Sequence, residues 1–346
     1  MAKKEKNALV KLSVLIVTKN EENYIARLLE DLLNQTIEKQ LYEIIVVDGM
    51  STDTTVKKVK LYLESHSQTV KLLTNPKQTL PPGWNIGIKE ARGDYIMRVD
   101  GHTSIPKDFL EKYLELLEKH PEVDCVGGII ESKGSGFQGT INQYVFSHQF
   151  GVGNSKFRTT TGIWEGFVDT VPYGAYKRKV FDEVGYFTEG LKRNEDIEFH
   201  KRMKDKGMQF YMSTSIKSTY YVRPTLKGVI KKSLGDGTWN IIADQSVKGS
   251  LRNRHKAPLI AFLMGLLVLL GSFFFSPFRW VLGVVIFLYF TAATIASVGL
   301  VKQQGVKYLI PTVCTFFCLH FFRGLGNFLA FFKKEFWRFR WNRRKR

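Results

Sequence analysis

Polar side chains able to bind cations, hydroxyl groups or protons follow three predicted β-strands of this 346-residue chain. Carboxylates and imidazoles ligate divalent cations, and carboxylates also accept protons from hydroxyl groups. Taken singly, each residue has an ordinary structural role, because Asn and Asp cap helices and fix turns. Their occurrence at three strand ends indicates a shared binding crevice instead. The segments are Thr18–Glu22, Asp48–Asp53 and Asp100–His102.

The elements that must position these segments alternate between β-branched runs and amphipathic helical patterns. This βαβ rhythm predicts an α/β fold with a mostly parallel sheet, in which ligand groups collect at the carboxyl ends of the strands. The strand runs are Leu12–Val17, Tyr42–Val47, Val70–Thr74 and Tyr95–Val99, and the helical runs are Tyr24–Asn34, Thr54–Leu63 and Trp84–Ala91.

Composition and motifs exclude several classes of protein. Hydrophobic residues at 44% and charged residues at 24% argue against both a disordered chain and a wholly membrane-embedded one. No Gly-x-Gly-x-x-Gly follows the first strand and no P-loop motif occurs, which disfavours dinucleotide and P-loop enzymes. Cys125, Cys314 and Cys318 are too few for a disulfide framework, so we expect reduced thiols.

The net charge of +19 is concentrated at the end of the chain. Residues 245–346 carry 16 of the 51 Lys and Arg residues but one of the 32 Asp and Glu residues. The nearly neutral front part is unsuited to binding a phosphate backbone, so we expect no nucleic-acid partner. Basic residues flanking apolar runs are instead typical of the cytoplasmic side of a membrane.

Two uncharged runs, Ala257–Phe275 and Trp280–Val301, are each long enough to cross a bilayer, and together they predict a helical hairpin. The alternative is a pair of buried helices in a soluble core. Met1–Lys11 has no apolar leader, so we expect the front part to stay in the cytoplasm. The predicted domains are residues 1–250, cytoplasmic and catalytic, and residues 251–346, the membrane region of a multi-pass plasma-membrane protein.

A third apolar run, Tyr308–Phe332, can span, re-enter or lie in the interface, and a basic tail, Lys333–Arg346, follows it. A third crossing would put this tail outside the cell, against the positive-inside bias. We therefore expect two crossings, with the third run re-entering or lying in the interface and bending at Arg323 and its flanking glycines. The residues expected to anchor a basic interfacial helix are Phe336, Trp337, Phe339 and Trp341.

Several motifs occur in a fixed order within residues 12–212: Asn20-Glu21-Glu22, Asp48-Gly49-Met50-Ser51, Asp100-Gly101-His102, Val184-Gly185-Tyr186-Phe187 and Glu195-Asp196. Their order and spacing resemble those of the family 2 glycosyltransferases with the GT-A fold. Within that family the chain looks most like the bacterial exopolysaccharide enzymes of the succinoglycan type, which also carry an Asp-x-His variant and C-terminal membrane segments. The resemblance implies a GT-A, Rossmann-like, mostly parallel sheet followed by a C-terminal helical membrane region.

The resemblance also implies a pocket for a nucleotide-sugar donor. Asp48 should accept a hydrogen bond from the base or the ribose, while Thr18, Asn20 and Glu22 line the same pocket. Lys19 stands where many relatives place an aromatic that stacks on uracil. The base is therefore open, and a UDP-sugar is the first expectation.

A divalent cation, Mn²⁺ or Mg²⁺, is the expected cofactor, because it neutralises the charge that develops on the leaving diphosphate. Asp100 matches the first carboxylate of the family's Asp-x-Asp motif, and His102 stands where the second normally lies. An imidazole suits Mn²⁺ better than Mg²⁺. The alternative is that His102 has no ligand role.

Asp196 matches the family's general base, which takes the proton of the acceptor hydroxyl. A carboxylate at a helix start also favours the helix dipole, so a purely structural role is the alternative. Residues Gly235–Trp239 lack the Gln-x-x-Arg-Trp signature of processive synthases, which favours transfer of a single sugar. The residues expected on the acceptor side are Glu195, Tyr173 and Trp239.

These observations predict an inverting, membrane-anchored glycosyltransferase that moves one hexose from a nucleotide-sugar to a lipid-linked glycan. The acceptor would be a polyprenyl-diphosphate-linked glycan at the cytoplasmic leaflet, in bacterial surface or exopolysaccharide synthesis, with membrane lipids as further partners. One alternative is a polyprenyl-phosphate sugar synthase, which transfers to the lipid phosphate itself. Another is a non-catalytic membrane scaffold.

Overall fold

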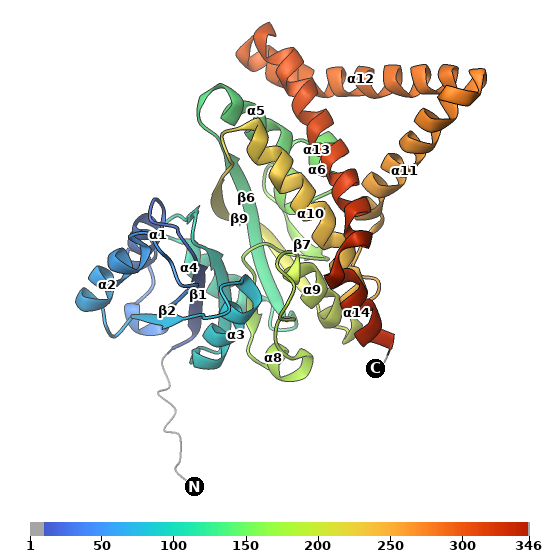
Figure 1. Cartoon of the computed structure of the whole chain (residues 1–346). Helices are drawn as coiled ribbons and strands as arrows, with labels where there is room; N and C mark the ends of the chain where they lie inside the picture. Colours follow the sequence, from blue (N-terminus) through green and yellow to red (C-terminus); the bar gives the residue numbers. More distant parts are fainter. Residues whose placement is uncertain (1–9, 345–346) are drawn as a thin grey trace. The chain divides into compact units, whose positions relative to one another are not determined.

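The computed structural model describes residues 10–344, without the side chains of Arg254 and Arg344 (Figure 1). Residues 1–9 and the tail residues Lys345 and Arg346, on which some predictions above rest, lie outside this range. The described chain forms two compact units. The sheet unit comprises the residues up to Glu131 together with Thr160–Tyr220, and the helical unit comprises Ser132–Thr159 together with the residues from Tyr221 onward.

A mixed β-sheet organises the sheet unit, with the order β3-β2-β1-β4-β8-β6-β9-β5 and with β7 paired to β9. The first four strands are parallel, as predicted, and the pairings of β8 with β4 and β6, and of β9 with β5 and β7, are antiparallel. The predicted α/β fold is therefore confirmed as a mixed sheet. The strands are β1 Leu12–Thr18, β2 Tyr42–Asp48, β3 Val70–Thr74, β4 Tyr95–Asp100, β5 Thr103–Ser104, β6 Cys125–Lys133, β7 Glu165–Val168, β8 Ala175–Lys177 and β9 Phe210–Tyr221.

Helices cover the sheet because its central strands are buried along their whole length. The apolar stripe of α1 is buried together with Val14 and Ile16 of β1 in one hydrophobic core. On α3, two glycines allow close approach to β1, since a Cβ on Gly83 would lie 2.5 Å from Val17 Cγ1. The helices of this unit are α1 Ile25–Leu33, α2 Thr55–Ser65, α3 Leu80–Glu90, α4 Phe109–Lys119, α8 Lys179–Val184 and α9 Glu195–Asp205.

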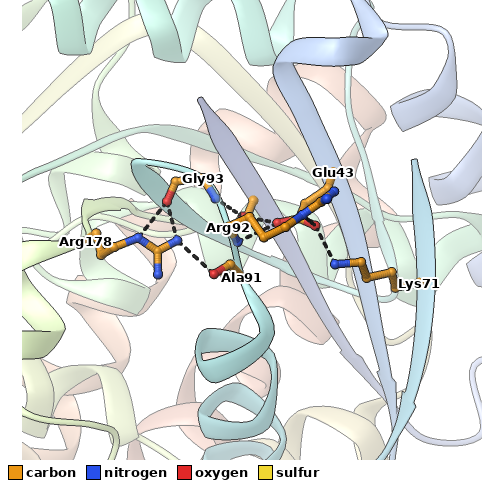
Figure 2. A network of polar contacts seen from close by, with 7 residues as sticks. Glu43, Lys71, Ala91, Arg92, Gly93 and Arg178 are labelled. Atoms are coloured by element: carbon orange, nitrogen blue, oxygen red, sulfur yellow. Dashed lines mark hydrogen bonds and ion pairs between the residues drawn. The ribbon is translucent and has the colours of Figure 1, made fainter. Parts of the chain in front are cut away.

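A buried carboxylate fixes the turn that leads from α3 into β4 (Figure 2). Glu43 of β2 is 1% exposed and accepts hydrogen bonds from Ser13 Oγ at 2.8 Å and from the Arg92 N–H at 2.6 Å, and it pairs with Lys71 Nζ at 3.0 Å. Gly93 packs against the β1 backbone, where a Cβ would lie 2.7 Å from Ser13 N. Arg178 donates to the carbonyls of Gly93 and Ala91. These contacts set the start of β4, and hence the place of Asp100 at its far end.

The helical unit contains an inserted segment and the C-terminal helices. The insertion forms α5 Gly136–Ser147, α6 Gln149–Val152 and α7 Lys156–Thr159, and the C-terminal helices are α10 Leu226–Ser246, α11 Asn253–Phe274, α12 Ser276–Gln304, α13 Leu309–Leu329 and α14 Lys334–Arg344. Three helical segments of the described chain are long and apolar enough to cross a membrane, namely His255–Phe274, Ser276–Gln304 and Val306–Phe332.

The bend that we expected at Arg323 is absent, because α13 stays helical through this residue and its neighbouring glycines. The glycines serve close helix packing instead. A Cβ on Gly326 would lie 2.3 Å from the Leu234 carbonyl oxygen of α10, and a Cβ on Gly237 would lie 2.3 Å from that of Arg323. Backbone contact between α10 and α13 therefore requires glycine on both helices.

Candidate active site

The loops after β1 and β2 are joined by hydrogen bonds. Ser51 donates twice to Asp48, from its Oγ to Oδ1 at 2.5 Å and from its N–H to Oδ2 at 2.9 Å. Asn20 accepts from the Thr52 N–H at 2.9 Å and donates its own N–H to Ser51 Oγ at 2.9 Å. Asn20 is held at φ 56°, a left-handed conformation that Asn tolerates. Asp48 and Asn20 are thus brought together at the carboxyl end of the sheet.

Glu22 fastens the same pair of loops, and Thr18 lies beneath them. Thr54 donates to Glu22 Oε2 from its Oγ1 at 2.6 Å and from its N–H at 3.1 Å, and these bonds hold the pKa of Glu22 below its usual range. Thr18 Oγ1 is buried with no hydrogen-bond partner among the described residues. A buried hydroxyl of this kind costs free energy unless a ligand or water satisfies it, so it fits a polar ligand better than an apolar core.

Asp100 ends β4 beside Val17 of β1, so the Asp-Gly-His motif lies at the carboxyl end of the two central strands. His102 Nδ1 lies 3.2 Å from Glu21 Oε1, and the imidazole packs edge-on against Tyr220. The Asp-Gly-His motif alone did not indicate that His102 contacts Glu21. Among residues 10–344, no group of three or more His, Cys, Asp and Glu side chains converges to hold a metal ion.

Glu195 and Asp196 begin α9, and the two carboxylates differ in their surroundings. Glu195 is 5% exposed and forms an ion pair with Arg98 of β4, with Nη2 and Oε1 2.9 Å apart. The Arg98 guanidinium lies between the rings of Trp84 and Phe187, 4.6 Å and 4.7 Å from their centroids. Asp196 is only partly buried. Arg98 therefore fixes the first residue of α9, and the second carboxylate, that of Asp196, stays partly exposed.

Electrostatics link the ends of β4 and α9. Burial raises the pKa of Glu195, although the charge of Arg98 opposes this effect. Burial lowers the pKa of Arg98, but the fields of Glu195, Tyr176, Asp196 and Asp100 outweigh it and raise that pKa. Asp100 and Asp196 thus both lie within electrostatic reach of one buried guanidinium.

Of the predicted acceptor-side residues, Glu195 and Tyr173 lie in the sheet unit and Trp239 lies on α10 of the helical unit. The Tyr173 hydroxyl accepts a hydrogen bond from Thr103 Oγ1 at 2.8 Å, and its carbonyl accepts one from the Tyr113 hydroxyl at 2.9 Å. Tyr173 is therefore held next to β5, directly after His102. Within the sheet unit, the structure brings Glu195 and Tyr173 close to the Asp-Gly-His motif, through the field of Asp100 and the bond to Thr103.

Residues 13–185 of the chain match the family described as Glycosyl transferase family 2. The chain is also 30% identical, over 331 residues, to the dolichyl N-acetyl-alpha-D-glucosaminyl phosphate 3-beta-D-2,3-diacetamido-2,3-dideoxy-beta-D-glucuronosyltransferase of Methanococcus voltae. That alignment covers 91% of this chain and 98% of the archaeal enzyme. The chain belongs to glycosyl transferase family 2.

This family 2 glycosyltransferase is also similar to a bacterial protein in sequence and to a solved archaeal structure in fold. It is 25% identical over 226 residues to the succinoglycan biosynthesis protein ExoA of Rhizobium meliloti, covering 65% of this chain and 67% of that one. The expected likeness to the succinoglycan type is therefore present, but it is weaker than the likeness to the archaeal enzyme. The mannosyltransferase of Pyrobaculum calidifontis, solved with GDP-Man and Mn²⁺, has the same fold at a TM-score of 0.60 and 16% identity, with 95% of this chain and 89% of that one covered.

Arg98, which pairs with Glu195, is a residue near the predicted site to which the sequence assigned no role. Its signal was a charged residue inside a β-branched strand run, two positions before Asp100 and hence on the same face of β4. A buried histidine, His200, contacts two hydroxyl groups of the same unit. His200 Nε2 contacts the Tyr176 hydroxyl at 2.7 Å and its Nδ1 contacts Thr170 Oγ1 at 2.7 Å, while burial keeps its pKa well below the usual range.

Proposed function

We propose that this family 2 glycosyltransferase transfers one hexose, with inversion, from a nucleotide-sugar to a saccharide carried on a polyprenyl lipid. The observation that carries this proposal is the alignment to the archaeal enzyme, because it runs through the apolar helices as well as the sheet. The name of that relative describes transfer to a sugar already linked to dolichyl phosphate. A UDP-sugar is the first donor to test, and surface or exopolysaccharide synthesis is the proposed pathway.

On the donor side, the joined loops after β1 and β2 would bind the nucleoside. The two hydrogen bonds from Ser51 hold the Asp48 carboxylate at the strand end, where it retains lone pairs for a base or ribose donor. Asn20 and Glu22 keep that loop in place through their own hydrogen bonds. Thr18 would offer its buried hydroxyl to the same ligand.

Asp100 and His102 would hold the divalent cation, because an aspartate and an imidazole together suit Mn²⁺, and substrate phosphates complete such sites. When bound, the cation supplies positive charge against the leaving diphosphate. Two protein ligands are consistent with the lack of a three-residue metal cluster in residues 10–344. His102→Ala should then weaken donor binding measured in Mn²⁺ by far more than it lowers the melting temperature, with Lys57→Gln on α2 as control.

The acceptor proton would pass to Asp196. Glu195 is buried and paired with Arg98, so it is not available as a base, whereas Asp196 is partly exposed at the start of α9. The Ile197 N–H donates to Asp196 Oδ1 at 2.9 Å, which orients the carboxylate and leaves Oδ2 to take the proton. A base at this position removes the proton from the acceptor hydroxyl while the nucleotide departs from the opposite face of the sugar. Tyr173 and Trp239 are the proposed acceptor contacts.

The helical unit would anchor the enzyme in the plasma membrane with the sheet unit in the cytoplasm. We place α11 and α12 across the bilayer, because Arg252 and Lys256 lie at the start of α11 and Lys302 and Lys307 lie at or just beyond the end of α12. We place α13 in the interface, since 39% of its most apolar 18-residue stretch is buried against protein, whereas none of the corresponding stretch of α11 is. Its partner α10 carries exposed Lys227 and Lys231, which are costly at the bilayer centre.

A donor and acceptor panel tests the proposal against its alternatives. The full chain in nanodiscs would be given nucleotide-sugars with Mn²⁺, Mg²⁺ or a chelator, and either polyprenyl phosphate or a polyprenyl-linked saccharide. Transfer to the saccharide alone is the expected result. Transfer to polyprenyl phosphate alone would identify a lipid-phosphate sugar synthase, and no donor binding or turnover with any nucleotide-sugar would identify a scaffold.

A further inference from the structure

Helix α14 has a docked face and an exposed face. On the docked face, Phe336 is 1% exposed and packs against Phe331, and Arg343 Nη1 donates to the Asp244 carbonyl of α10 at 3.0 Å. The expectation that Phe336 anchors the helix in lipid is therefore wrong, because docking on α10 turns this side chain inward. Apolar and basic side chains alternate along this helix, so the choice of face depends on tertiary contacts that the sequence does not show.

The exposed face combines tryptophan with basic residues. Lys334, Trp337, Arg338 and Trp341 follow the spacing i, i+3, i+4, i+7, so they form one stripe along the helix. All four are exposed, with Trp337 at 54% and Trp341 at 61%. We call these four residues the Trp-basic stripe.

The Trp337 ring of the Trp-basic stripe is held in place. The Trp337 indole N–H donates to the Phe331 carbonyl at 2.9 Å, and the Arg340 guanidinium lies 5.3 Å from the centre of the Trp337 indole ring. An exposed indole with its N–H already bonded presents an oriented apolar surface at little entropic cost. Exposed Phe332, at 71%, and exposed Lys333 extend the same composition to the turn before α14.

We propose that the Trp-basic stripe binds the anionic headgroup layer of the bilayer. Tryptophan prefers the boundary between headgroups and acyl chains. Each Lys or Arg near an anionic leaflet adds about 1 kcal/mol of electrostatic attraction to the lipid. The apolar run Val306–Phe332 ends two residues before the stripe begins, so a membrane that receives this run brings its headgroups to α14. This inference rests on the membrane placement proposed above and adds the lipid class and the residues that recognise it.

Lipid is the occupant best matched to this stripe. A nucleic acid would also attract the cations, but two indole rings projecting beside them suit an apolar boundary. The continuity with an apolar run points the same way. A protein partner remains as an outcome of the test below, since it would bury the same side chains without contact with lipid.

Quenching by brominated lipid in nanodiscs tests the Trp-basic stripe in the full chain. Wild type and Trp337→Phe/Trp341→Phe would be compared in bilayers that contain brominated phosphatidylglycerol or brominated phosphatidylcholine. The difference in fluorescence between wild type and the double variant is the emission of Trp337 and Trp341. We expect brominated phosphatidylglycerol to quench this emission more than brominated phosphatidylcholine does. Lys334→Gln/Arg338→Gln should reduce that preference by about fivefold for each charge removed.

The matched control removes two exposed lysines from α2 of the sheet unit, Lys57→Gln/Lys60→Gln, which changes the net charge equally and should leave the preference unchanged. The inference is overturned if brominated lipid does not quench the fluorescence of the stripe. Quenching by aqueous iodide would then show a stripe exposed to water, and protection from iodide would show a stripe covered by a protein partner. Failure of the chain to incorporate into nanodiscs would instead overturn the proposed membrane placement, so the two failures are distinguishable.

Discussion

The sheet unit and the helices α11 and α12 of the helical unit place their large apolar side chains in opposite ways. In the sheet unit, the largest buried side chains are aromatic and aliphatic, such as Trp84, Tyr113 and Phe199. In the helical unit, α13 also buries large side chains, Phe316 and Leu319, but large apolar residues of α11 and α12 are widely exposed. Leu267 at 57% and Phe287 at 69% are examples.

The membrane placement proposed above explains this difference by two different solvents. In water, burial of large apolar surfaces drives folding, so a water-soluble unit keeps most of its large apolar side chains in the core. In lipid, burial of apolar surface gives no hydrophobic gain, so helices associate through small residues and interhelical hydrogen bonds. The Tyr144 hydroxyl of α5 donates an interhelical hydrogen bond of this kind to the Ala296 carbonyl of α12, at 2.6 Å. The comparison therefore supports a water-facing sheet unit and a lipid-facing pair of helices, α11 and α12.

The largest expected effect is at Arg98 in the sheet unit. Arg98→Met leaves the buried Glu195 carboxylate without its partner, which should cost about 3–5 kcal/mol of stability. Arg98→Met/Glu195→Gln removes both charges and should recover most of that stability. If Arg98 positions Asp196, the double variant should still turn over slowly with a donor KM near that of wild type, and Arg98→Lys should recover part of kcat. Full turnover by the double variant would reduce Arg98 to a structural role.

A matched pair of leucines tests the comparison directly. Leu28→Ala on α1 empties a fully buried site and should lower the free energy of unfolding of the sheet unit by about 2–5 kcal/mol. Leu267→Ala on α11 removes a side chain that faces lipid, so the expected loss is below about 1 kcal/mol. Urea unfolding of both variants in nanodiscs measures the difference. Equal losses would mean that α11 packs against protein and not lipid.

Glycine packing in the helical unit should give a smaller effect. Gly326→Ala puts a Cβ within 2.3 Å of the Leu234 carbonyl oxygen, so α10 and α13 must separate, at a cost of about 1–3 kcal/mol. Gly265→Ala on α11 is the control, because its Cβ would meet nothing within 4 Å. Melting temperatures in nanodiscs should fall for the first variant only. An unchanged melting temperature for both would show that the close contact is not needed.

The sequence predicted the sheet unit better than the helical unit for a physical reason. Strands such as β1 are buried along their length, so their β-branched runs mark their bounds within one residue. The role of Arg98 depends on Glu195 and two aromatic rings from distant segments, which no local pattern shows. Likewise, the sequence pattern of the glycines near Arg323 is the same whether they bend the helix or allow another helix to pack closely. Only the position of α10 in the structure distinguishes the two roles.

The smallest expected effect is the acid sensitivity of the sheet unit at Glu43. Burial raises the pKa of this carboxyl, but hydrogen bonds from Arg92, Lys71 and Ser13 outweigh burial and lower the pKa below its ordinary value. A depressed pKa stabilises the fold above about pH 4.5, and this stabilisation is lost as the pH falls through the folded-state pKa. Glu43→Gln should flatten that part of the stability curve. Parallel curves for variant and wild type below pH 5 would contradict this assignment.

The most direct test of the account compares Asp196→Asn with wild type in nanodiscs, measuring donor affinity and sugar transfer on the same samples. Asp205→Asn, an exposed carboxylate at the end of α9, is the matched control. The account predicts that Asp196→Asn binds the nucleotide-sugar as tightly as wild type and transfers it about 10²- to 10⁴-fold more slowly, while Asp205→Asn transfers normally. Equal loss of binding and transfer, or undiminished transfer, would contradict the placement of the catalytic base at the start of α9.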